Sequence, residues 1–404
     1  MALAVAAAAI LLLALRPPRV PAWLWPIAGA ALLIGIGNEP LRNAAAAIAR
    51  QWNVLLFILG LMGISAAADR SGAFEWIGDV VVRAARGSRR RLFVLLFIAC
   101  SIVTLLLSND ATAIALTPVV YRAVRVRLPD EIKPFLLGCV FAANTASFGL
   151  PFSNPANVLI LPHAQLWPYL WHLAPAQVAA IAVTLGIFLF FFSHELQGRF
   201  EAGATHAPTA RTFRTVGAFV IIIAAYFVAL ILRWPLGPIA SGGALLTIAV
   251  AATPPLDVAR RISWKTLVLL AALFVLLDAV ARGGFVAWTL MALERAVRYG
   301  SLATISAAAA GTALLSNLFN NLPVAVVAAY IVERISAPQL AYPLILGVDV
   351  GPNLVTSGSL ATILWMTILR GYGVRIKLVE YLRVGALVVP ATLGVSVLWL
   401  WLAK

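Results

Sequence analysis

The sequence predicts an all-α polytopic membrane protein built from two inverted-topology repeats. Of its 404 residues, 62% are hydrophobic and only 11% are charged, a composition that soluble domains do not have. The 30 Lys and Arg residues outnumber the 15 Asp and Glu residues, and they cluster in short segments between apolar runs. This pattern is typical of cytoplasmic loops rather than of a surface that binds nucleic acid. In addition, the first half of the chain recurs in the second half.

The duplication is visible in matched residues at a nearly constant spacing. Examples are Trp52 and Trp264, which differ by 212, Ser108 and Ser316, which differ by 208, and Asn144 and Asp349, which differ by 205. We therefore expect a first repeat over residues 1–193 and a second over residues 215–404. The polar segment 194–214 would join them as a cytoplasmic linker.

Apolar runs of suitable length predict the ordinary membrane spans. A helix needs roughly 20 residues to cross the hydrocarbon core, with some latitude for short or tilted spans. We expect such spans at residues 2–15, 21–37, 52–68, 175–193, 215–232, 238–253, 264–280 and 383–402.

Two further segments predict re-entrant helical hairpins. Residues 92–121 contain a single charge, Asp110, and are flanked at both ends by arginines, which places both ends in the cytoplasm. The segment is too long for one crossing and too short for two, so we expect two short arms that meet at Ser108, Asn109 and Asp110. The duplicate hairpin, at residues 299–332, would have its tip at Ser316–Asn317 and Asn320–Asn321.

Residues 134–165 and 338–369 predict discontinuous helices. Each is interrupted by a polar stretch rich in Gly and Pro, at 144–157 and 349–362. Unpaired backbone groups within a membrane cost several kcal/mol each, so such breaks persist where they serve a site. With these two helices the chain has about ten spans plus two hairpins, and five crossings per half invert the second repeat. The predicted cytoplasmic segments are 16–20, 83–91, 122–133, 194–214, 254–263 and 370–382, and residues 162–174 lie outside.

Four segments carry a resemblance to a known family: LSNDATAIALTPVV, NNLPV, PFSNPANVLI and DVGPNLVTSGSLATILW. They resemble the signature segments of arsenite efflux permeases of the ArsB type, in the ion-transporter superfamily, and LGLMGISAAADRSGAFEW extends the match. The resemblance implies a multi-pass transporter of the bacterial inner membrane that exports arsenite or antimonite, driven by protons or by an ArsA-type ATPase. The chain has no phosphate-binding loop of its own, so a stand-alone carrier that is not an enzyme is the default.

The polar residues expected near the middle of the membrane are amides and hydroxyls, without Lys or Arg. A neutral trihydroxide such as arsenous acid suits them, because each of its hydroxyls can donate and accept. A dicarboxylate held by helix N-termini and a sodium ion remains possible. The predicted substrate-binding residues are Ser108, Asn109, Thr112, Asn144, Ser153, Asn154, Asn157, Ser316, Asn317, Asn320, Asn321, Thr356 and Ser359.

Asp110 and Asp349 are the two acids within the hairpins and broken helices. Ionisable residues at this depth are functional candidates, so we expect them to exchange protons as the coupling ion, although each could instead cap a helix. We expect no cofactor and no metal site, and we interpret Cys100 and Cys139 as apolar filler. The alternatives are a sodium-coupled dicarboxylate or anion carrier, a sodium/proton antiporter, and a channel or ATPase-docked pore.

Overall fold

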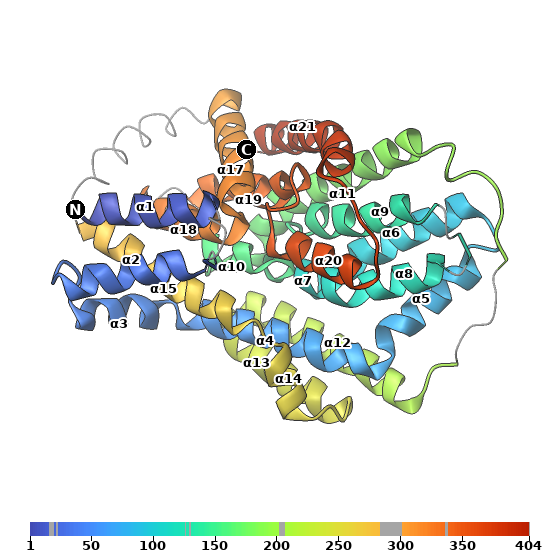
Figure 1. Ribbon diagram of the computed structural model, residues 1–404, viewed down its shortest axis with the longest axis horizontal. Coiled ribbons are helices and arrows are strands. Elements are labelled where there is room, and N and C mark those ends of the chain that lie inside the picture. Colours follow the sequence, from blue (N-terminus) through green and yellow to red (C-terminus); the bar gives the residue numbers. More distant parts are fainter. Residues whose placement is uncertain are drawn as a thin grey trace.

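The computed structural model describes residues 1–15, 20–21, 23–125, 127–128, 131–201, 207–282, 301–335 and 338–403. Within these ranges the chain is helical, and the one β feature is an isolated antiparallel bridge between Ser88 and Arg199. Figure 1 shows the helices of both halves packed into one bundle, with α7, α10, α19 and α20 in its interior. The prediction of an all-α fold is confirmed.

Most residues of the first half lie in eleven helices. They are α1 (Ala2–Leu15), α2 (Leu24–Gly35), α3 (Leu41–Arg50), α4 (Trp52–Ala68), α5 (Ala73–Ala84), α6 (Arg89–Leu106), α7 (Asn109–Ala111), α8 (Thr117–Arg125), α9 (Ile132–Thr145), α10 (Pro155–Ile160) and α11 (Leu166–Phe191). Short 3-10 turns lie at Asp69–Ser71 and Pro151–Ser153, and a π turn, η2, lies at Thr112–Leu116.

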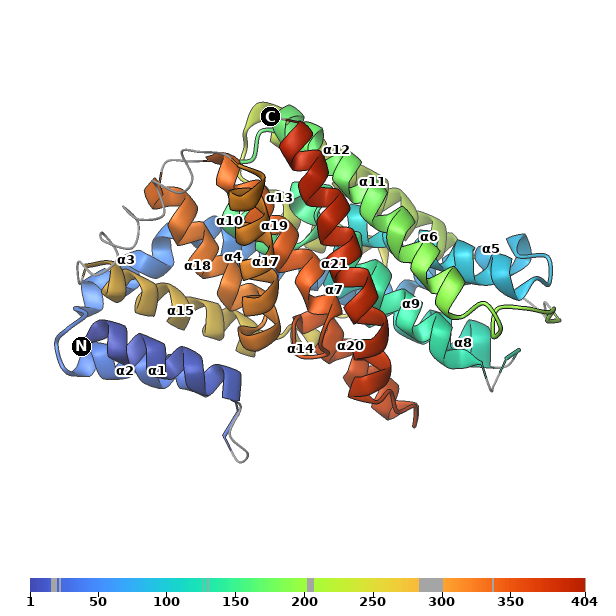
Figure 2. The same ribbon diagram turned by 90° about the horizontal axis from the view of Figure 1, so that it is seen from above.

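The second half follows a similar order. Its described helices are α12 (Ala210–Leu232), α13 (Leu236–Val250), α14 (Pro255–Arg261), α15 (Trp264–Arg282), α17 (Leu302–Phe319), α18 (Asn321–Ile335), α19 (Ala341–Val350), α20 (Leu360–Gly371) and α21 (Leu378–Leu402). The 3-10 turns lie at Pro338–Leu340 and Gly351–Asn353. Figure 2 shows α11 and α21 lying side by side along one flank, and these two helices pack directly against each other.

Helix length and apolarity are sufficient for membrane crossing in five described helices. A sixth crossing results if α14 and α15, which meet at a bend of 54°, are counted as one span. Several other apolar helices are shorter, including α1, α9 and α20. The arrangement of about ten spans in two inverted repeats therefore stays a prediction. Helix α11 already begins at Leu166, so part of the predicted outside segment 162–174 is helical.

The first predicted hairpin has its break where the sequence places it. Helix α6 begins after Ser88, whose hydroxyl accepts a hydrogen bond from the Arg91 amide at 3.3 Å, and it ends before Leu107. The extended residue Ser108 then caps α7, because its Oγ accepts from the Ala111 amide at 3.0 Å. The helix next widens into the π turn η2, a feature that often marks functional sites.

The second hairpin corrects one detail of the prediction. Ser316 and Asn317 do not lie at its tip, because α17 continues through them to Phe319. The break falls at Asn320, whose φ of 76° and ψ of 152° lie outside both the right-handed and the left-handed helical regions, so the helix cannot continue through it. The break at Ser108 therefore corresponds to Asn320, at the same offset of 212 that relates Trp52 to Trp264. The matching Ser–Asn pairs are four residues out of structural register.

Both broken helices are interrupted within the polar stretches 144–157 and 349–362. The first runs through α9, a non-helical stretch at 146–154 that contains one 3-10 turn, and α10. The second runs through α19, a corresponding stretch at 351–359, and α20. The second break packs closely on α17, because a Cβ at Gly351 would lie only 2.6 Å from the Cα of Ala313. Glycine is therefore required there for backbone to approach backbone.

Candidate functional site

The two broken helices exchange side-chain hydrogen bonds with each other. Asn154, which caps α10, donates its Nδ2 to Asp349 Oδ1 at 2.6 Å, and Asp349 lies in the last turn of α19. Ser359, which caps α20, donates its Oγ to Asn144 Oδ1 at 3.1 Å, and Asn144 lies in the last turn of α9. In both pairs the N-cap of one half meets the last helical turn of the other. The two caps differ by 205 residues, and so do their two partners.

A closed network surrounds Asn144. Its Nδ2 donates to Asn353 Oδ1 at 3.2 Å and to Thr362 Oγ1 at 3.0 Å, while Asn353 Nδ2 donates to Thr145 Oγ1 at 2.9 Å. Each of these residues is at most 1% exposed. Because these groups satisfy one another, we interpret this part of the site as the joint between the two halves.

Other buried polar atoms have no hydrogen-bond partner within the described residues. Four of them lie in the broken helices and the second hairpin: Asp349 Oδ2, Asn157 Oδ1, Asn321 Oδ1 and Ser316 Oγ. The first three belong to α19, α10 and α18, which pack against one another, and Ser316 lies on the adjoining helix α17. The side chains of Ser147 and Asn157 lie beside the Asp349 carboxyl, but they donate to the backbone oxygens of Asn144 and Ser147 and neither makes a hydrogen bond to Asp349 Oδ2. Buried groups of this kind require an explanation, and a bound solute or water provides one.

The first hairpin tip uses most of its polar side chains to hold its own shape. Besides the Ser108 cap, Asn109 Oδ1 accepts from the Asp110 amide at 2.9 Å, and Thr104 Oγ1 donates to Thr112 Oγ1 at 2.7 Å. The Asp110 side chain is half-buried, and the structure gives its carboxylate no hydrogen bond or ion pair with any described residue. Within the described chain, no side-chain hydrogen bond connects this tip to the pairs of the broken helices.

The second hairpin tip is fastened to the break of the second broken helix. Asn317 Nδ2 donates to Gly351 O at 2.9 Å, and Asn317 Oδ1 accepts from the Val355 amide at 3.0 Å. Asn320 Nδ2 donates to Ser357 O at 3.2 Å. These predicted site residues are therefore committed to positioning the break. Thr356, in the same break, is half-buried.

The first break is held in a similar way by residues of its own segment. Ser153 Oγ donates to Leu150 O at 2.7 Å and also to Ser147 O. Asn157 Nδ2 donates to Ser147 O at 2.8 Å, which leaves its Oδ1 free. The predicted residues Ser153 and Asn157 thus lie in the same segment as Asn154, the partner of Asp349.

The sequence analysis missed positioning residues on the long helices, among them Gln177 and Tyr381. Gln177 on α11 donates its Nε2 to Thr145 O at 2.6 Å and accepts from the Phe148 amide at 3.1 Å. Tyr381 on α21 donates its hydroxyl to Pro352 O at 3.0 Å. Each fixes the break of its own half from a long neighbouring helix. An isolated Gln within an apolar span was the available signal, because such polar residues usually bond other helices.

Metal coordination has no support in the described part of the chain, where no group of three or more His, Cys, Asp or Glu residues could hold an ion. Cys100 and Cys139 are both buried free thiols. The site is therefore a set of amides, hydroxyls and one buried carboxylate at the meeting point of two interrupted helices. Apolar helices around such a site define a membrane transporter.

Comparison with known proteins gives the family. The family model described as citrate transporter (CitMHS) matches residues 3–357, and the chain belongs to this family. It is 28% identical to an arsenical pump membrane protein of Yersinia enterocolitica over 365 residues, 85% of each chain. It is 27% identical to the protein of the same name from Escherichia coli, again over 85% of each chain. The resemblance stated from the sequence is confirmed.

A solved structure supports the fold independently of these relatives. The Alcanivorax borkumensis YdaH transporter superimposes with a TM-score of 0.56 at 12% sequence identity, covering 89% of this chain and 87% of that one. At this identity the likeness concerns the fold alone. Together with the family, it makes the chain a multi-pass transporter of the bacterial inner membrane.

Proposed function

We propose that this transporter exports trivalent arsenite or antimonite from the cytoplasm in exchange for protons, by alternating access. The observation that carries the proposal is the set of free acceptor oxygens around α10, α18 and α19: Asp349 Oδ2, Asn157 Oδ1 and Asn321 Oδ1. They favour a solute that brings hydrogen-bond donors. The names of the relatives, which are arsenical pump membrane proteins, point to the same class of solute.

Arsenous acid meets this requirement. At neutral pH it is an uncharged trihydroxide, so it offers O–H donors and needs no counter-charge. A dicarboxylate, in contrast, offers acceptors only, and the site residues include no Lys or Arg that could balance its charge. The sodium-coupled carboxylate carrier is therefore the less favoured alternative.

Asp349 and Asp110 are proposed to carry the coupling protons. They are the two acids within the hairpins and broken helices, and a carboxyl in this position can load a proton on one side and release it on the other. One charge moved through 100 mV is worth about 2.3 kcal/mol, which supports a concentration ratio on the order of 50 for a neutral solute exchanged against one proton. A stand-alone carrier could therefore keep cytoplasmic arsenite low. An ArsA-type ATPase partner is the alternative source of energy.

The deciding experiment is arsenite uptake into proteoliposomes that contain only the purified chain, with an imposed pH gradient and without ATP. Uptake that requires the gradient would support a self-sufficient proton-coupled carrier. Transport that requires an added ATPase would keep the solute but replace the coupling mechanism. Movement of citrate or succinate on sodium, without arsenite uptake, would refute the proposal in favour of the carboxylate alternative.

A further inference from the structure

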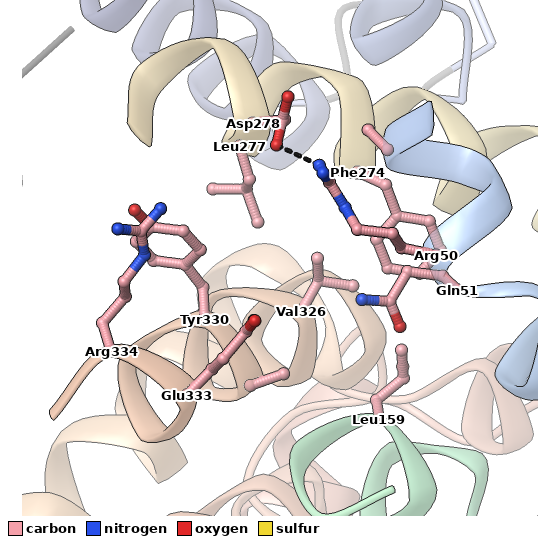
Figure 3. Close-up of a pocket in the computed structure, with 12 residues that line it drawn as sticks. Arg50, Gln51, Leu159, Phe274, Leu277, Asp278, Val326, Tyr330, Glu333 and Arg334 are labelled. Atoms are coloured by element: carbon pink, nitrogen blue, oxygen red, sulfur yellow. Dashed lines mark hydrogen bonds and ion pairs between the residues drawn. The ribbon is translucent and has the colours of Figure 1, made fainter. Parts of the chain in front are cut away.

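A pocket of about 190 Å³ lies outside the site described above, where α10, α15 and α18 meet the junction of α3 and α4 (Figure 3). One wall carries Arg50 and Asp278, which form an ion pair. The facing wall, on α18, carries Glu333 and Arg334, and the Arg334 guanidinium lies 5.3 Å from the centre of the Tyr330 ring. The pocket is thus polar on two sides.

The charges that line the pocket cancel. Each wall carries one arginine and one acid, Arg50 with Asp278 and Arg334 with Glu333. The other lining residues are uncharged. A pocket with no net charge gives an anion no electrostatic advantage over a neutral solute. The polar side chains that line the pocket can, however, donate hydrogen bonds to hydroxyl groups and accept hydrogen bonds from them. A small neutral polyhydroxide is therefore the chemical class that this pocket accommodates best.

The floor of the pocket connects it to the candidate site. Leu159 on α10 lies five residues beyond Asn154, and Val326 on α18 lies five residues beyond Asn321. At 1.5 Å per helical residue, each is about 7.5 Å along its helix from the polar residue at its start. Both residues are apolar and buried, at 2% and 3% exposure, and they lie between one and two helical turns from these polar residues.

The repeat relates α10 to a helix at the opposite end of the molecule. Helix α20, which matches α10 at an offset of 205, packs against η2 and α8 as α10 packs against α18. At that end the rings of Tyr121 and Tyr372 stack with centroids 4.1 Å apart and planes 9° apart. These tyrosines adjoin or lie in the predicted cytoplasmic segments 122–133 and 370–382, whereas α10 leads into the segment predicted to lie outside.

We infer that the pocket is the outward mouth of the transport route, through which a small neutral hydroxylated solute leaves after it passes Leu159 and Val326. The inference rests on the proposed function for the direction of travel. It adds the exit path and the apolar residues that close its inner end.

Cysteine labelling tests the inference directly, because the two native cysteines are buried. Ala329 is half-buried and lines the pocket, so an Ala329→Cys variant would carry a thiol in the mouth. Asn38 is exposed and does not line the pocket. It lies at the same end of the molecule, because its neighbour Glu39 is 3.8 Å from Arg282, at the end of α15. Asn38→Cys therefore provides a control thiol. Export is measured from cells treated with a membrane-impermeant, positively charged methanethiosulfonate, and modification is followed by mass spectrometry.

External reagent should modify both variants and abolish arsenite export only by Ala329→Cys. Full modification of Ala329→Cys with undiminished export would overturn the inference, as would modification only from the cytoplasmic side. If Ala329→Cys is inactive before treatment, Gln51→Cys, at a half-buried residue where α3 meets α4, is tested in the same way. Failure of the unmodified chain to export arsenite would instead refute the proposed function, while the side from which the thiol reacts would still decide whether the pocket opens outward.

Discussion

Replacement of Asp349 by Asn tests the coupling mechanism most directly. Asp349 Oδ1 accepts a hydrogen bond from Asn154 at 2.6 Å, whereas its Oδ2 has no partner in the described structure. Asparagine has the same shape and keeps an oxygen for Asn154, so the fold should lose only about 1 kcal/mol, the difference between a charged and a neutral hydrogen bond. The variant cannot, however, bind or release a proton.

The expected size of the effect follows from the gradient. With the membrane potential clamped at zero, a pH difference of one unit is worth about 1.4 kcal/mol, so one proton per arsenous acid supports an accumulation of about tenfold. Wild-type proteoliposomes should approach this ratio, and Asp349→Asn should remain near one. Exchange of labelled for unlabelled arsenite across the membrane without a gradient should persist, because it needs binding and conformational change but no coupling.

Ser359→Ala is the matched control. It removes a hydrogen bond at the equivalent cap of the other half, so it should weaken transport without uncoupling it from the gradient. Asp110→Asn is measured in parallel, because the half-buried Asp110 is the second candidate carrier of protons. Tenfold accumulation by Asp349→Asn would refute a proton role for Asp349, and loss of accumulation by Asp110→Asn alone would transfer that role to Asp110.

Three further predictions concern stability, and thermal unfolding of the purified protein in detergent measures each of them. Asn144→Ala breaks three buried side-chain hydrogen bonds and should cost on the order of 3 kcal/mol, whereas Thr356→Ala should change stability by less than about 0.5 kcal/mol. An Asn144→Ala variant as stable as wild type would contradict the role of this network as the joint. Burial raises the pKa of the Glu39 carboxyl, so the folded state holds that proton more tightly and stability should fall as pH rises above about 4.5 through the raised pKa. Glu39→Gln should remove this decline, and an unchanged pH profile would exclude Glu39 as its cause. Tyr372→Ala removes the stack with Tyr121 and should cost about 1 kcal/mol, whereas Tyr372→Phe should unfold like wild type; equal losses in both variants would assign the effect to the hydroxyl.

Local features of the sequence were sufficient to predict much of the architecture. Apolar run length predicted helices, and clusters of Gly and Pro predicted the interruptions at 146–154 and 351–359, because both effects act within a few residues. The same reasoning chose Asn154, Asn157 and Asp349 as site residues, since polar groups at a break within an apolar segment are rare.

The register of the second hairpin shows where sequence reasoning failed. The Ser–Asn match between the repeats suggested that Ser316 corresponds to Ser108. A helix ends, however, where a residue adopts non-helical backbone angles, and sequence identity between repeats does not determine that position. Nothing between Ser316 and Phe319 breaks a helix, so α17 continues to Asn320, whose backbone leaves the helical region at a φ of 76°.

The sequence by itself determined that this protein is a duplicated helical membrane transporter with breaks that carry amides and carboxylates. Only the tertiary structure decided which of these groups satisfy one another and which remain free. Asn154 and Asp349 are 195 residues apart, and Asn144 and Ser359 are 215 apart. Such pairs form because the two halves pack with their interrupted segments against each other. Local preferences of the sequence extend over a few residues only, so they cannot determine a contact between residues this far apart. The free oxygens of Asp349 and Asn157, on which the proposed function depends, are what this packing leaves unpaired.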